Sequence, residues 1–166
     1  MVNQKLEIPL EKLYPVLIYN FVTDEIPSTA DYEKRLLWQK IGYLAQQLGA
    51  LLDEYTFNWY KAGPYSPGYT SLLYSLPNSL DESLNYELTD AAKEQLKPMK
   101  EIIENIPEGM SIPKWFELVG SIVYLKKNTG LNKTEVLKSL VRKKPFFNND
   151  YINSYAWDLL GKLNML

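Results

Sequence analysis

The chain has 166 residues, of which 46% are apolar and 23% charged, and its formal net charge is −2; these values fit one globular domain spanning residues 1–166. It contains no cysteine and no histidine. Disulfides, thiolate metal sites and thiol nucleophiles are therefore excluded, and the usual general base at neutral pH is missing. We expect a non-catalytic protein without a metal or another cofactor. The sequence shows neither a secretory signal pattern nor a membrane span, which predicts a cytoplasmic protein without a membrane partner.

The first part of the chain is expected to contain two helices. The first should begin near Pro15, because proline is tolerated in the first turn of a helix. The second follows a cap at Ser28 or Asp31. Its apolar residues recur every three or four positions and so lie on one face: Leu37, Ile41, Leu44, Leu48 and Leu51.

A short β element is expected next. Residues 55–60 carry aromatic side chains at alternate positions, which is typical of a strand. Turn-forming residues follow, and Ser66 with Pro67 predicts the cap and first turn of a short helix over residues 67–76. Residues 86–88 are expected to form a second strand.

Four further helices are expected in the rest of the chain. One begins at Thr89 and should be kinked or split by Pro98. The next is capped by Ser111 and is apolar around nearly its whole circumference, so it should lie in the core. Asn132 caps a third, and the last begins at Asp150.

The order of these elements predicts a mainly α fold. A winged-helix-like unit over about residues 28–106 would contain a short two- or three-stranded β element. A helical bundle over about residues 111–166 would pack onto it. No repeat or low-complexity linker separates the two parts, so we expect a single domain.

The turn after the aromatic strand is the first candidate site. Tyrosine offers a large contact area at a small cost in rotamer entropy, which suits a protein interface. In the alternative, the turn only links a strand to a helix and its tyrosines pack inward. The candidate partner-binding residues are Tyr60, Gly63, Pro64, Tyr65, Ser66 and Tyr69.

The charges are unevenly distributed along the chain. No Lys or Arg occurs between Lys61 and Lys93, so the short helix in the place of a DNA-recognition helix has no cation for phosphate, which argues against ordinary winged-helix DNA binding. Residues 112–148 are basic, with eight cations against two carboxylates. In the alternative, these cations only complement the dipoles of helix ends. The candidate patch for a nucleic acid or an acidic partner is Lys126, Lys127, Lys133, Arg142, Lys143 and Lys144.

Five segments between about residues 30 and 160 stand in a distinctive order: Arg35–Leu44 with its Gln-Lys core, Phe57–Ser66 ending in Gly-Pro-Tyr-Ser, Tyr86–Thr89, Glu117–Lys127 and Lys143–Pro145. Together they resemble the YwgA-like proteins, a prokaryotic group, and more distantly the Panacea (SocA-type antitoxin) domain. Trp38 replaces a Leu of that group, and Lys61-Ala62 is inserted before Gly63. The resemblance implies a winged-helix-like fold with added helices, binding to a protein partner such as a toxin, and no catalytic residues.

These observations predict a non-catalytic protein-interaction module, antitoxin-like or a regulatory adaptor. The alternative is a nucleic-acid-associated transcriptional or defence regulator that uses the basic last third. A third hypothesis, a hydrolase working through carboxylates, lacks any supporting motif. Self-association into a homo-oligomer is left open.

Overall fold

The structure, a computed structural model, describes residues 9–51, 54–77 and 79–166. Seven α-helices, one 3₁₀ helix and two short strands occur within these ranges. In chain order they are α1 (Leu10–Thr23), α2 (Tyr32–Gln47), β1 (Asn58–Tyr60), β2 (Gly63–Tyr65), α3 (Pro67–Tyr74), the 3₁₀ helix η1 (Asp81–Asn85), α4 (Asp90–Glu104), α5 (Ile112–Thr129), α6 (Lys133–Lys143) and α7 (Asp150–Lys162). The mainly α class with a short two-stranded β element is confirmed.

Most helices begin where the sequence places a capping side chain. The oxygen of each cap accepts a hydrogen bond from a backbone N–H in the first turn, which satisfies a group that the helix itself leaves unpaired. This explains why the predicted starts are accurate from α2 onward. The caps of α2 to α7 are Asp31, Ser66, Thr89, Ser111, Asn132 and Asn149.

Two helices contain a proline in their interior. The predicted start of the first was wrong, and the predicted split of the other does not occur. α1 begins at Leu10 and not near Pro15, and α4 runs through Pro98 without being split. Proline removes a backbone donor, but tertiary packing supplies most of the stability of a helix in a protein. Pro15 is buried, and its carbonyl accepts a hydrogen bond of 3.3 Å from the Trp38 indole. Met99, next to Pro98, is fully buried.

The two strands form one antiparallel hairpin, in which Tyr60 faces Gly63 across the turn. Lys61 and Ala62 form this turn. The strand predicted at residues 86–88 is absent. β1 pairs instead with β2, which follows it after two residues, because closing so short a loop costs less entropy than pairing with a distant segment. The strand pair therefore precedes α3 and does not flank it.

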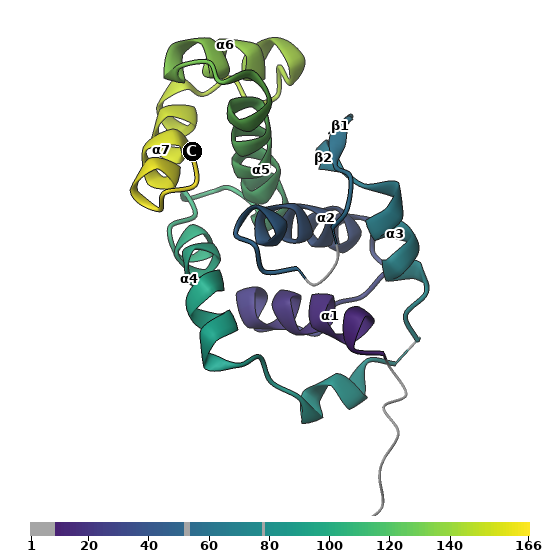
Figure 1. The fold of residues 1–166 in the computed structure, drawn as a ribbon. Coiled ribbons are helices and arrows are strands. Elements are labelled where there is room, and N and C mark those ends of the chain that lie inside the picture. The colour runs from purple at the N-terminus through teal and green to yellow at the C-terminus, as the bar shows by residue number, and fades with distance from the viewer. Residues whose placement is uncertain (1–8, 52–53, 78) are drawn as a thin grey trace, which may run out of the picture.

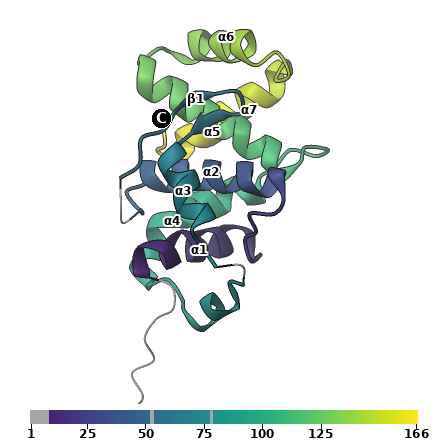
Figure 2. The ribbon, with the colours of Figure 1, turned by 90° about the vertical axis from the view of Figure 1, so that its right-hand side faces the viewer.

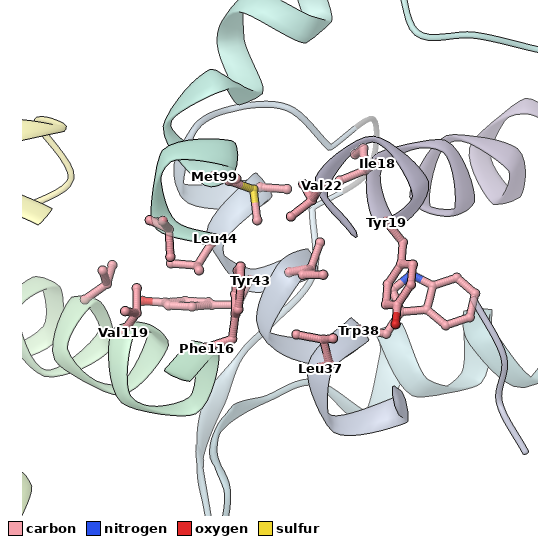
Figure 3. Close-up of a cluster of buried hydrophobic side chains, with 14 of the residues drawn as sticks. Ile18, Tyr19, Val22, Leu37, Trp38, Tyr43, Leu44, Met99, Phe116 and Val119 are labelled. Atoms are coloured by element: carbon pink, nitrogen blue, oxygen red, sulfur yellow. The ribbon is translucent and has the colours of Figure 1, made fainter. Parts of the chain in front are cut away.

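α2 and α5 form the centre of the molecule. In Figure 1, α2 lies between α1 and α5, α6 packs on α5 at the end away from α1, and α7 runs alongside α5. Figure 2 shows the same order along the long axis. Side chains from α1, α2, α4 and α5 meet in the core (Figure 3), where the rings of Tyr19 and Trp38 lie 5.4 Å apart. Buried residues from both the earlier and the later helices belong to one hydrophobic cluster.

No helix in the described ranges is both long enough and apolar enough to cross a bilayer.

Candidate functional site

Three long side chains hold the β1–β2 hairpin against the helices. Lys40 of α2 donates a hydrogen bond of 2.6 Å to the carbonyl of Pro64. Lys144, which follows α6, donates one of 2.6 Å to the carbonyl of Lys61. The Lys144 ammonium also lies 2.9 Å from a carboxylate oxygen of Glu117 in α5. We call Lys40, Glu117 and Lys144 the hairpin clasp.

A second set of hydrogen bonds fixes the chain just after the hairpin. The Gln39 side chain accepts a hydrogen bond of 3.1 Å from the Ser66 N–H, and its amide donates one of 2.6 Å to the Thr70 hydroxyl. Ser66 in turn accepts a bond from the Tyr69 N–H and caps α3. The start of α3 is thereby tied to α2.

The hairpin approaches α5 closely at Gly63. This residue has φ +88°, a left-handed conformation that glycine adopts without steric cost. A Cβ atom there would lie 2.7 Å from the Ser121 hydroxyl oxygen, inside van der Waals contact. That hydroxyl is buried and has no hydrogen-bond partner among the described residues. Gly63 is therefore required both by the turn and by the contact.

The three charged groups of the clasp are buried, so burial and their mutual interactions both affect the pKa values of Glu117 and Lys40. Burial alone would raise the pKa of Glu117, but hydrogen bonds and charge from Lys144, and then from Lys114 at 3.1 Å, outweigh it and hold that pKa below its ordinary value. Burial lowers the pKa of Lys40 to about 7, against the opposing attraction of Glu117. Near pH 7 the Lys40 side chain is therefore present in both its charged and its neutral form.

A neutral lysine amine is a nucleophile in some enzymes. Here the Lys40 amine faces the Pro64 carbonyl, and the residue is 1% exposed. No group of three or more aspartate or glutamate residues that could hold a metal occurs in the described part of the chain. In this arrangement the clasp positions the hairpin.

The structure divides the predicted partner-binding residues into two groups. Gly63, Pro64, Ser66 and Tyr69 are buried, so the prediction that Tyr69 lies on a contact surface was wrong. Its ring packs where α3 crosses α2, so close that a Cβ at Gly42 would lie 2.5 Å away from it.

Tyr60 and Tyr65 remain at the surface. Tyr60 is exposed, Tyr65 is half-buried, and their rings meet edge to face with centroids 5.0 Å apart. This geometry is a favourable aromatic pair, and it gives the outer side of the hairpin a defined shape.

Tyr65 also lines a small groove between α2 and α3 that the sequence did not predict. The groove has a volume of about 210 Å³ and contains Tyr32, Arg35 and Tyr74. Tyr32 is 64% and Tyr74 59% exposed. The Arg35 guanidinium lies 5.7 Å from the centroid of the Tyr32 ring and 6.0 Å from that of Tyr74, so it stacks with both rings. We call Tyr32, Arg35, Tyr65 and Tyr74 the tyrosine groove.

The predicted basic patch is not one surface. Lys144 is buried in the clasp, Lys126 bonds to the carbonyl of Leu131 at the end of α5, and Lys133 pairs with Asp158 at 3.0 Å. Lys143 is exposed and lies 5.8 Å from the Trp59 ring centroid. Lys127 and Arg142 are exposed.

The sequence contains a signal for the clasp in two charged residues. Glu117 is a single charge between apolar residues of α5, and Lys40 stands in a mostly apolar part of α2. A charge in such a place must be paired when it is buried. Tyr32 and Tyr74 gave no comparable signal, because single exposed aromatic residues are common.

No protein-family model, curated protein or solved structure matches this chain.

Proposed function

We propose that the protein is a non-catalytic, cytoplasmic protein-interaction module, antitoxin-like or a regulatory adaptor, which binds its partner through the tyrosine groove. The observation that carries this proposal is the stacking of Arg35 between two exposed tyrosines beside Tyr65. Tyrosine and arginine are the residues that most often dominate the energy of protein interfaces.

The clasp supports the same proposal. Tyr65 directly follows Pro64, whose carbonyl is held by Lys40, and precedes Ser66, which is held by Gln39. A contact surface fixed before binding loses little conformational entropy when the partner arrives. The buried polar residues around the hairpin thus pre-organise the surface that binds.

The test uses the full chain with an affinity tag, incubated with extract of its own cells. Tyr65→Ala and Tyr74→Ala should each remove the proteins that the wild type retains. Tyr151→Ala is the matched control, because Tyr151 is 79% exposed but lies on α7. Capture that is equal for all variants, or lost only with Tyr151→Ala, would contradict the proposal.

The nucleic-acid alternative is supported only by the exposed cations Lys127, Arg142 and Lys143. Binding to phosphates would weaken steeply with salt and with charge reversal at these three positions. A tyrosine-based protein contact would change little with salt. A gel-shift series over rising salt, with the triple Glu variant beside Tyr65→Ala, separates the two functions.

A further inference from the structure

A second groove lies between α6 and the first turns of α7, and it shares no lining residue with the tyrosine groove. Its volume is about 610 Å³. Leu137 and Val141 lie within it and are only partly buried. They are four positions apart on α6, so they share one face of the helix. They form an apolar floor.

Cations surround this floor. Lys133, Lys138 and Arg142 all line the groove, against one carboxylate, Asp150. Lys138 is 73% exposed at its side chain and lies 3.9 Å from Glu135. Arg142 is exposed and forms no ion pair within the described residues. Exposed pairs contribute little stability, so carboxylates of a partner can replace the present ones.

The length of the groove fits a helix. From Lys133 to Arg142 the α6 face rises by roughly 13 Å, at about 1.5 Å per residue, which corresponds to about two and a half helical turns. An amphipathic helix lays apolar side chains spaced by three or four residues on such a floor. Its flanking aspartates or glutamates would face Lys133, Lys138 and Arg142. The charged phosphates of a nucleic acid would make no apolar contacts with Leu137 and Val141.

We propose that the α6–α7 groove binds an acidic amphipathic helix of a protein partner. This site is separate from the tyrosine groove, so either proposal can fail without the other. It assigns a role to Lys133 and Arg142 of the predicted basic patch.

The probe is a display library of helical peptides of about 18 residues, long enough for five turns, with variable exposed positions. Binders are selected on the wild type and then tested on Lys138→Glu and Arg142→Glu. We expect the enriched peptides to carry Leu or Phe at i, i+4 and i+7 with Asp or Glu beside them. Each charge reversal should weaken them at least tenfold, and Lys97→Glu, an exposed lysine of α4, should not.

Several results would overturn the proposal. The library yields no binder above background, the enriched peptides are neutral or basic, or the binders are unaffected by Lys138→Glu and Arg142→Glu. Short single- and double-stranded DNA and RNA serve as competitors. If they bind with the same dependence on Lys138 and Arg142 and displace every peptide, the groove is a nucleic-acid site instead. Tyr65→Ala must leave peptide binding unchanged, which keeps this test apart from that of the tyrosine groove.

Discussion

Lys144 and Glu117, 27 positions apart in the sequence, form a buried ion pair of 2.9 Å whose cation also binds the carbonyl of Lys61 in the hairpin turn. Removing two charges from water costs about as much as their attraction returns, so such a pair adds little net stability. Its effect is on geometry. It fixes one position of the hairpin relative to α5 and thereby helps to place Tyr65 in the tyrosine groove.

Breaking this pair should be far more costly than its net contribution suggests. Lys144→Met removes the closest cation from the buried Glu117 and the donor from the Lys61 carbonyl, and we expect a loss of about 3–5 kcal/mol in the free energy of unfolding. The matched control is Lys133→Met, which removes the exposed pair with Asp158 and should cost less than about 1 kcal/mol. Urea unfolding measures both. Similar losses of unfolding free energy in the two variants would mean that Glu117 and Lys144 are accessible to water.

The low pKa of Lys40 predicts how stability depends on pH. Its pKa is about 7 in the folded protein and 10.5 as the ordinary value, so the unfolded chain binds more protons between these values. The free energy of unfolding should therefore rise with pH above about 7, by at most about 1.4 kcal/mol per pH unit, and contribute no slope below it. Lys40→Met should abolish the rise between about pH 7 and pH 9. An equal slope in both proteins would show that Lys40 stays charged.

Gly63 and Gly130 give a matched pair for the close contact at the hairpin. Both have positive φ, +88° and +67°, but a Cβ at Gly130 meets nothing within 4 Å. Gly130→Ala should cost only the backbone strain, roughly 1–2 kcal/mol. Gly63→Ala should cost about 1–3 kcal/mol more, because the new methyl overlaps the Ser121 hydroxyl. Thermal unfolding in wild-type and Ser121→Ala backgrounds tests this, since the extra cost should shrink when the hydroxyl is absent.

Ser121→Ala alone should be neutral or stabilising. A buried hydroxyl without a hydrogen-bond partner carries a desolvation cost of about 1–3 kcal/mol, and alanine removes it with little change in volume. Ser66→Ala provides the contrast, because the Ser66 hydroxyl caps α3 and its loss should cost about 1 kcal/mol. Destabilisation by Ser121→Ala would indicate a partner that the described residues do not include.

The features that the sequence predicted correctly are local. Caps such as Ser111 and Asn132 act within one helical turn, and the apolar face of α2 follows from its spacing. The exceptions in α1 and α4 arise because distant packing outweighs the local effect of Pro15 and Pro98.

The site depends on contacts between distant parts of the chain. Lys40 meets Pro64 over 24 positions and Lys144 meets Lys61 over 83, and no periodicity encodes such pairs. The sequence predicts a contact surface at the tyrosine turn, but the inward direction of Tyr69 follows from its packing on Gly42. The meeting of Tyr32 and Tyr74 around Arg35 required the crossing of α2 and α3, which spacing does not give.

The hairpin has three residues in each strand, too few to persist alone in water. Its anchor at Lys144 is made 83 residues after the turn, so a nascent chain on the ribosome exposes the hairpin before α6 has emerged to secure it. The contact at Lys61 can thus form only late in synthesis, whereas the side chains that hold Pro64 and Ser66 precede the hairpin in the chain. A chain cut short before α6 would therefore lack the anchor at the hairpin turn and keep only the contacts that Lys40 and Gln39 make at Pro64 and Ser66.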